Sequence, residues 1–158
     1  MKRWIYIAIA VIIAFVGYKV WELIQWYDAL NIIPTGKIKG MKDGKIRVNL
    51  TVALDNPKDF QISITKPTIR IYSNGTLLTS SVPSGTKVLI APTGITYIDY
   101  ELLVPVQSEL FRMLISGGSQ AWNQIQAGEN ISAGIAIEVL AYFQVFGIER
   151  IYREKITI

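Results

Sequence analysis

The feature that most constrains this chain is an apolar run close to its start. Residues 4–18 read WIYIAIAVIIAFVGY and contain no charged side chain, while Lys2 and Arg3 directly precede them. A helix that is hydrophobic on every side is buried, either in a protein core or in a membrane. The run therefore has four possible roles: a cleaved secretion signal, a membrane anchor, the stem of a filament, or a core helix of a soluble protein.

A membrane anchor matches the surroundings of this run best. The apolar character resumes beyond Lys19, whose long side chain can extend to the lipid headgroups. The usable stretch therefore runs from residue 4 to about residue 24, which matches the roughly 20 residues that a bilayer requires. Tryptophan and tyrosine, which favour the membrane interface, occur at both ends. The predicted interfacial contacts are Trp4, Lys19, Trp21 and Trp26.

The other three roles match less well. A cleaved signal requires small residues at the cleavage site, but the sequence after the run, VGYKVWELIQW, is bulky. A filament stem of the type IV pilin kind carries a glutamate near its start, whereas Glu22 lies near the end of this run. A core helix rarely has aromatic residues at both ends. Because Lys2 and Arg3 precede the span, the positive-inside tendency predicts a cytoplasmic amino terminus and an extracytoplasmic remainder.

Composition narrows the possible chemistry. The 158 residues include neither cysteine nor histidine, which removes disulfides, thiol nucleophiles, cysteine-ligated metals and the commonest general base. The net charge of +4 is spread in ones and twos without a basic block, so nucleic-acid binding is not expected. We predict no cofactor, no metal site and no catalytic residue, and we expect a protein that is not an enzyme.

Beyond residue 36 the hydrophobic period changes to two. In KIRVNLTVALDNP, residues 45–57, every second residue from Ile46 onward is apolar, which predicts a half-buried strand that ends at the Asn-Pro pair. Asn-Gly best tolerates the positive φ angles of a type I′ turn, so it predicts a hairpin within TIRIYSNGTLLTSS, residues 68–81. The residues expected to shape these loops are Asn56, Pro57, Asn74 and Gly75.

The remaining sequence predicts further strands and one helix. In GITYIDYELLVPV, residues 94–106, the alternation of apolar and polar residues is interrupted, which suggests a β-bulge. SELFRMLISGG, residues 108–118, has apolar side chains at helical spacing after Ser108, which suits a helix cap. Residues 131–158 predict a final pair of strands that turns near Gly147.

The fold expected from these elements is mainly β. It is an antiparallel, Greek-key-like β-sandwich of about seven strands with one short helix, preceded by a single N-terminal transmembrane helix. The expected boundaries are residues 1–27 for the anchor, 28–36 for a neck marked by Pro34 and Gly36, and 37–158 for the sandwich.

One pair of acidic residues is a weak candidate for a catalytic site. Asp99 and Glu101 lie two residues apart on a predicted strand, so they share a face and would suit an enzyme that acts on envelope material. Because no second pair of carboxylates is in view, we interpret them instead as a solvated polar face or as ion-pair partners of Arg70 or Arg112.

The β part also resembles a known family. The progression VNLTVALDNPKDFQISITKPTIRIYSNGTLLTSS, in which a strand runs into Asn56-Pro57 and two strands meet at Asn74-Gly75, resembles the late-embryogenesis-abundant type 2 domain, or water-stress and hypersensitive-response domain. The later helix and the terminal hairpin that ends in REKITI agree with it. The resemblance covers about residues 37–158. It implies a sandwich of about seven strands with one helix, often behind an N-terminal anchor, and no catalytic residues. Members are associated with stress protection or with cell envelopes.

These observations lead to one functional expectation and one alternative. We expect a single-pass, membrane-anchored structural or binding module outside the cytoplasm, with the lipid bilayer as its first partner. The alternative is a structural subunit of a larger assembly, such as a lipid-containing virion or an envelope appendage, whose protein neighbours pack against the anchor and the sandwich. A core rich in Ile, Val and Leu would also suit an apolar ligand, although no sequence feature demonstrates a cavity.

Overall fold

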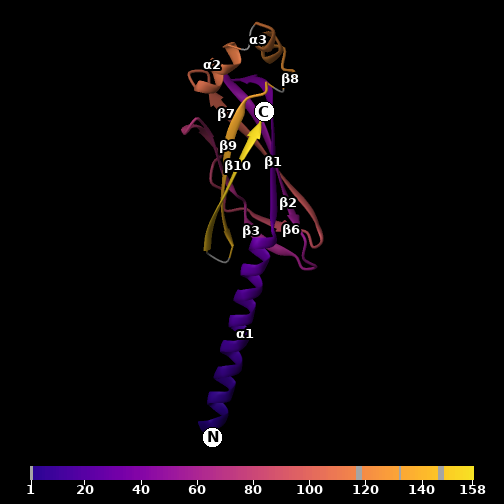
Figure 1. Ribbon diagram of the computed structural model, residues 1–158, viewed down its shortest axis with the longest axis vertical. Coiled ribbons are helices and arrows are strands. Elements are labelled where there is room, and N and C mark those ends of the chain that lie inside the picture. The colour runs from indigo at the N-terminus through magenta and orange to yellow at the C-terminus, as the bar shows by residue number, and fades with distance from the viewer. Residues whose placement is uncertain (1, 117–118, 132, 146–147) are drawn as a thin grey trace.

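The computed structural model shows a long N-terminal helix and a mainly β part (Figure 1). Helix α1 (Lys2–Ala29) projects from one end of the β part, and the short helices α2 (Glu109–Ser116) and α3 (Ser119–Gln126) lie at the opposite end. We refer to residues 30–158 as the β domain. The structure describes residues 2–116, 119–131, 133–145 and 148–158, and the side chains of α1 at residues 6–22, 24 and 25.

The β domain contains three antiparallel sheets. Their strand orders are β7-β2-β1-β8, β10-β9-β4-β5 and β3-β6. The bounds are β1 Asn31–Lys42, β2 Lys45–Asn56, β3 Ile62–Thr65, β4 Thr68–Ser73, β5 Thr76–Ser80, β6 Lys87–Ile90, β7 Gly94–Pro105, β8 Asn130–Ile131, β9 Ala136–Val145 and β10 Ile148–Thr157. The prediction of a mainly β, antiparallel fold is confirmed. The described residues form more strands than the seven or so expected, and two short helices instead of one.

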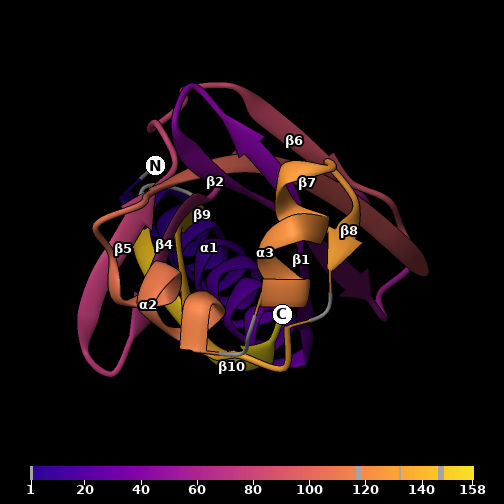
Figure 2. The same ribbon diagram turned by 90° about the horizontal axis from the view of Figure 1, so that it is seen from above.

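Strand β2 provides the centre of the core. Its inward residues are at most 1% exposed, as the period of two predicts: Ile46, Val48, Leu50, Val52 and Leu54. They belong to one continuous apolar cluster with residues of the facing sheet, which include Ile69, Ile71, Val139 and Phe143. The two larger sheets therefore pack face to face, and the view along the long axis shows them on opposite sides of the core (Figure 2).

The predicted neck at residues 28–36 is wrong. Helix α1 continues to Ala29 and strand β1 begins at Asn31, which pairs with Asp55 of β2. Pairing continues along β1 through the positions expected to form the neck. The β domain therefore begins directly after the helix and not at residue 37.

Pro34 and Gly36 fit inside β1 for two different reasons. Pro34 pairs with Val52 on one side only, because β8 reaches β1 no earlier than Ile38 in the described residues, and an edge position tolerates proline. Gly36 leaves room for the last side chain, since a Cβ there would lie 2.7 Å from Cγ2 of Ile158. Both residues look like breakers in the sequence, but each fits a specific place in the sheet.

Register shifts lie in β1 and in β4 but not in β7, so the predicted position of the β-bulge is wrong. Strand β7 pairs with β2 in continuous register over its whole length. Its apolar phase looks broken because Ile95 and Tyr97 lie on the outer face, where they are 50% and 64% exposed. The register shifts instead fall between Ile38 and Met41 of β1, and between Ile71 and Tyr72 of β4.

The predicted hairpin at Asn74-Gly75 is confirmed. These residues have φ angles of 47° and 80°, and Ser73 of β4 pairs with Thr76 of β5 across the turn. The β1–β2 hairpin turns in the same way at Asp43-Gly44, with φ angles of 52° and 69°. Two tight turns thus set the register of two hairpins.

The predictions for the C-terminal part are also largely confirmed. Helix α2 occupies the expected segment, although the hydroxyl of Ser108 is buried without a hydrogen-bond partner among the described atoms. The carbonyl oxygen of Ser108 instead accepts hydrogen bonds from the N–H groups of Phe111 and Arg112. The final strand pair is present as β9 and β10, while the turn expected near Gly147 lies outside the described residues.

Candidate functional site

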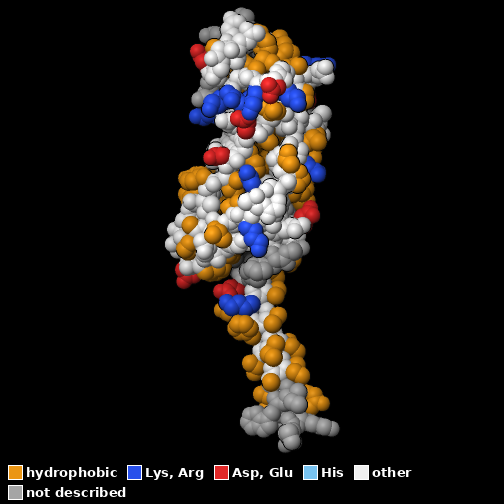
Figure 3. Space-filling view, turned by 180° about the vertical axis from the view of Figure 1, so that it is seen from behind, with side chains coloured by type: hydrophobic (Ala, Val, Ile, Leu, Met, Phe, Trp, Pro, Cys, Tyr) orange, Lys and Arg blue, Asp and Glu red, His pale blue; other side chains and the backbone are white. Residues whose placement is uncertain are grey.

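Helix α1 exposes apolar side chains all around its axis. Its large apolar residues from Tyr6 to Ile24 are between 44% and 70% exposed wherever the structure describes them. Figure 3 shows such side chains along the projecting helix. Large contiguous apolar surfaces on a protein normally mark a contact with a partner or a membrane. In the part of the chain that the structure describes, no helix has both the length and the hydropathy needed to cross a membrane.

The end of α1 nearest the β domain combines aromatic and charged side chains. Lys19 Nζ forms an ion pair of 2.7 Å with Glu22 Oε2 and lies 5.9 Å from the ring centre of Tyr18. Trp21 is 57% exposed, and its ring centre lies 6.3 Å from that of Tyr18. The side chains of two other predicted interface residues lie outside those that the structure describes: Trp4 and Trp26.

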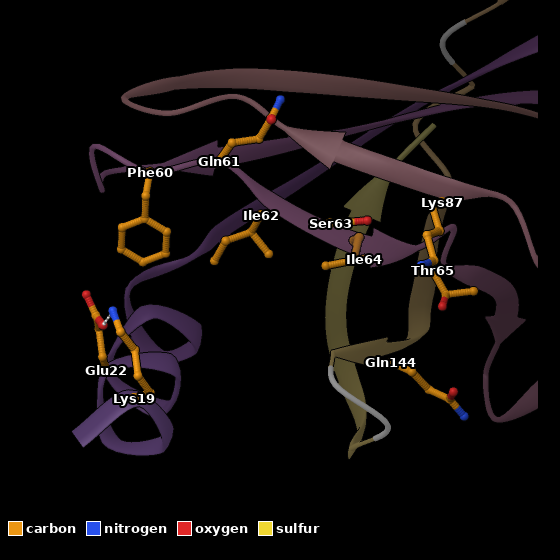
Figure 4. A pocket seen from close by; sticks show the side chains of 10 residues that line it. All are labelled: Lys19, Glu22, Phe60, Gln61, Ile62, Ser63, Ile64, Thr65, Lys87 and Gln144. Carbon is orange, nitrogen blue, oxygen red and sulfur yellow. Dashed lines mark hydrogen bonds and ion pairs between the residues drawn. The ribbon is translucent and has the colours of Figure 1, made fainter. Parts of the chain in front are cut away.

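A groove lies beside this segment, at the junction of α1 and the β domain (Figure 4). Its volume is about 720 Å³. Three parts of the molecule meet there: α1, the strands β3 and β6, and the end of β9. We call it the junction groove, and its lining residues are Lys19, Glu22, residues 60–65, Lys87 and Gln144.

The junction groove exists because β3 and β4 belong to different sheets. Strand β4 pairs with β9 from Thr68 opposite Tyr142, whereas β3, which directly precedes it, pairs with β6. Pro67 lies between the two strands, where its missing N–H donor suits a break in pairing. The last residues of β9 therefore have no β4 residue opposite them, and Gln144 faces the groove instead.

The open edge of β3 adds hydrogen-bonding groups. In an antiparallel pair, the backbone N–H and C=O groups of successive residues point alternately toward the partner strand and away from it. The N–H of Lys66 donates to the carbonyl oxygen of Thr86 at 2.8 Å, so the backbone groups of Lys66 point toward β6. By that alternation the backbone groups of Ser63 and Thr65 point away from β6. Figure 4 shows β3 between β6 and the groove. The groove wall therefore offers backbone amides and hydroxyl groups.

The charges of the groove sum to +1, from two lysines and one glutamate. Lys19 is paired with Glu22, and within the described residues Lys87 forms no ion pair. Phe60 and Ile62 add apolar surface beside these groups. The groove therefore combines cationic, hydrogen-bonding and apolar elements, which suits an anionic amphipathic molecule.

Asn56 holds the loop that carries Phe60 into the groove. Its side chain is fully buried, and Nδ2 donates to the carbonyl oxygens of Phe60 at 3.0 Å and Ala91 at 2.9 Å. Its Oδ1 accepts from the N–H of Lys58 at 3.0 Å. The following Pro57 is exposed. The end of β2, the loop before β3 and the end of β6 thus meet at one amide.

The second predicted loop lies at the other end of the β domain. Asn74 Nδ2 donates to Glu109 Oε1 of α2 at 2.7 Å, which ties the β4–β5 hairpin to that helix. Gly75 follows it in the turn and has open space around the position of a Cβ. The structure therefore does not bring the two predicted loops together.

Asp99 and Glu101 share the outer face of β7, as predicted, but their partners differ from those expected. Glu101 Oε1 lies 2.7 Å from Lys42 Nζ, and Oε2 lies 3.8 Å from a terminal nitrogen of Arg47. The hydrogen bond from Lys42, together with the nearby positive charges, lowers the pKa of the Glu101 carboxyl. Asp99 accepts a hydrogen bond from the Thr51 hydroxyl at 2.6 Å.

These contacts link β7 to β2, and across β2 to β1, on the outer face of one sheet. The expected partners of the two carboxylates, Arg70 and Arg112, are therefore wrong; the Arg70 guanidinium lies 4.6 Å from the ring centre of Tyr142. Among the described residues, no three carboxylates gather in a way that could hold a metal ion.

Sequence reasoning missed most of the junction groove. Lys19 was predicted as an interface residue, but Phe60, Ser63, Lys87 and Gln144 come from distant segments with no shared motif. The one available signal is Pro67, because a proline between two short apolar runs marks a place where a strand can leave its sheet.

The fold and the groove define a mainly β protein with antiparallel sheets around one core and a projecting apolar helix. No family model matches the chain, and no curated protein matches it. A protein of Arabidopsis thaliana whose solution structure is known is similar over 82% of this chain and 81% of its own, with 15% identity and a TM-score of 0.50. This likeness concerns the fold alone.

Two further solved structures show weaker similarity. A protein from Archaeoglobus fulgidus is similar over 82% of this chain and 97% of its own, at 14% identity and a TM-score of 0.45. The β-glucosidase DesR from Streptomyces venezuelae is similar over 82% of this chain but only 15% of its own, at 8% identity and a TM-score of 0.27.

Proposed function

We propose that this chain is a single-pass, membrane-anchored structural or binding module that is not an enzyme. Its N-terminus would lie in the cytoplasm and its β domain outside it. The observation that carries the proposal is the apolar surface of α1, which is exposed on all sides from Tyr6 to Ile24.

Lipid is the environment that best covers such a surface. Contact between water and so many apolar side chains is unfavourable, and a single neighbouring protein surface would cover only one side of the helix. A bilayer covers every side. Lys19 and Trp21, at the end of α1 nearest the β domain, have the chemistry that favours the headgroup level. Lys2 and Arg3 at the other end support the proposed orientation.

The family hypothesis is part of the same proposal. It assigns residues 37–158 to a Greek-key-like sandwich of the late-embryogenesis-abundant type 2 kind, with a role in stress protection or in the cell envelope. Its support is the run of residues from the β2 strand through Asn56-Pro57 to the Asn74-Gly75 turn.

An apolar patch on the β domain favours a second candidate, a structural subunit of a larger assembly. Ile33 of β1 and Tyr97 of β7 both pair with Ala53 of β2. They therefore lie in one row across the outer face of the sheet that contains these three strands. Ile95 lies in the next outward row, and the three side chains are between 45% and 64% exposed. In an assembly, this patch and α1 would both contact neighbouring subunits.

Membrane extraction and protease protection together test the anchor. The full chain is expressed in cells, the membranes are washed with alkaline carbonate, and intact cells are treated with external protease. We expect the chain to stay in the washed membranes and the protease to remove the β domain. The double variant Ile9→Asp, Ile13→Asp is expected to wash off, because two charges in the apolar run oppose insertion.

The matched control places the same two charges on the β domain, as Leu77→Asp with Leu89→Asp, at positions that are already exposed. This control should remain in the membrane. If the unmodified chain washes off, the anchor proposal is rejected. A defined oligomer in mild detergent that becomes a monomer in the Tyr97→Asp variant would favour the assembly subunit instead.

A further inference from the structure

We propose that the junction groove binds the anionic phosphodiester headgroup of a phospholipid from the bilayer that holds α1. This inference rests on the proposed membrane anchoring and adds a ligand class to it. The groove lies directly beside the helix, because Lys19 and Glu22 of α1 form part of its lining.

The position of the groove along α1 matches the headgroup level. The uncharged run ends at Tyr18, and the first charged residues after it, Lys19 and Glu22, are the α1 residues that line the groove. A helix with its apolar run in the hydrocarbon places the next turn among the headgroups. A lipid beside the helix would therefore have its phosphate at the height of the groove.

The charges of the groove complement a phosphodiester. The net charge of +1 from Lys19, Lys87 and Glu22 balances the single negative charge of that group. Lys87 is free of ion pairs within the described residues, and Lys19 uses one carboxylate contact, which leaves further N–H donors on its ammonium. A headgroup that also carries a cation, such as choline, would not gain this balance.

The remaining lining suits the glycerol part of the lipid. Ser63 and Thr65 offer hydroxyl groups and the open backbone edge of β3, while Phe60 and Ile62 provide an apolar wall. The volume of about 720 Å³ lies within the range of small-molecule sites, so it accommodates a headgroup with its glycerol. The acyl chains would then continue along the apolar surface of α1.

Lipid retention measured by mass spectrometry of the intact complex tests this inference. The full chain is reconstituted into vesicles of phosphatidylcholine that contain a minor fraction of phosphatidylglycerol, extracted in mild detergent, and the bound lipids are counted. We expect phosphatidylglycerol to be enriched over its share in the vesicle. Lys87→Gln should reduce its binding about tenfold, because a charge-assisted hydrogen bond is lost.

Two further variants separate a specific site from general attraction. Ser63→Trp keeps every charge but fills the groove, and it should also reduce the binding of phosphatidylglycerol. Lys155→Gln removes the same charge from an exposed position of β10 outside the groove, and it should retain the lipid as the unmodified chain does. Equal losses in Lys87→Gln and Lys155→Gln would overturn the inference.

Two more outcomes distinguish the possible failures. If glycerol phosphate in solution displaces the lipid and its binding depends equally on Lys87, the site is one for soluble anions and the lipid assignment is rejected. Flotation with vesicles of phosphatidylcholine alone tests the anchor independently. A chain that floats but shows no enrichment of phosphatidylglycerol rejects only the groove inference, whereas a chain that does not float rejects the anchor.

Discussion

Helix α1 and strand β2 contain the same kinds of side chain in opposite environments. The inward isoleucine, valine and leucine residues of β2 are at most 1% exposed, whereas the described isoleucine and valine side chains of α1 are between 44% and 66% exposed. The difference lies in the spacing. Alternation turns one face of β2 toward a facing sheet of the same chain, but an uninterrupted run on a helix points in all directions. The apolar surface of β2 is therefore covered within the molecule, and that of α1 requires cover from outside.

One pair of substitutions tests this contrast most strongly. Leu50→Ala leaves a cavity at the centre of the core and should lower the free energy of unfolding of the β domain by about 2–5 kcal/mol. Ile12→Ala removes a similar volume from α1 and should change the free energy of unfolding of the β domain by less than about 0.5 kcal/mol. Urea unfolding of the full chain in detergent micelles measures both. An equally large loss for Ile12→Ala would show that α1 packs against the β domain.

The next test addresses the register shift of β1 beside α3. At Gly40, φ is 76°, and a Cβ would lie 2.9 Å from Cα of Gly128 and 3.0 Å from the carbonyl oxygen of Ile125. Gly40→Ala should therefore destabilise the β domain by about 2–4 kcal/mol, from backbone strain and overpacking together.

Gly44→Ala is the matched control for Gly40→Ala. Its φ angle of 69° is similar, but nothing lies within 4 Å of the position of a Cβ. It should cost about 1 kcal/mol, from the positive φ alone. The same unfolding assay compares the two variants, and equal losses would mean that the close approach of α3 to β1 contributes nothing.

A smaller effect is expected for Asn56, whose hydrogen bonds lie within the β domain at the end nearest α1. Asn56→Ala removes three hydrogen bonds from a buried site and leaves backbone groups without these partners. We expect a loss of about 1–3 kcal/mol. Because the same bonds position Phe60, the variant should also weaken lipid retention in the groove. Unchanged stability would indicate that water replaces the amide.

The smallest effect concerns pH. Burial raises the pKa of Tyr100 above its ordinary value of 10.0, and its hydroxyl donates to the carbonyl oxygen of Pro67 at 2.8 Å. Burial and the hydrogen bond with Glu154 raise the pKa of Tyr152 to about 12. Below pH 10 both tyrosines keep their protons in the folded and unfolded states. Above it the unfolded chain releases protons first, so the free energy of unfolding falls as pH rises.

Tyr100→Phe should flatten this alkaline decline, by about 1 kcal/mol over one pH unit. The urea midpoint measured from pH 9 to pH 11 follows the decline in the unmodified chain and in the variant. Parallel curves would mean that Tyr100 does not contribute to it.

The parts of the fold that sequence predicts are those fixed by neighbouring residues. The alternation from Ile46 to Leu54 and the Asn74-Gly75 turn are local, and both are found as expected. Asp43-Gly44 carries the same turn signal. Pro34 and Gly36 were misread because their fit depends on an edge position and on Ile158, more than a hundred residues away. The junction groove, built from four separate segments, likewise leaves no local pattern.

The length of β1 determines how far the electrostatic potential of a membrane surface would reach into the β domain. From Asn31, beside α1, to Gly40, beneath α3, the strand rises by nine residues, or roughly 30 Å at about 3.3 Å each. The Debye length at physiological salt is about 8 Å. With α1 in a bilayer, the potential of charged headgroups would reach the junction groove but would be screened before α2 and α3. Changes in salt would then alter lipid binding at one end of the β domain while contacts made at the other end remain unaffected.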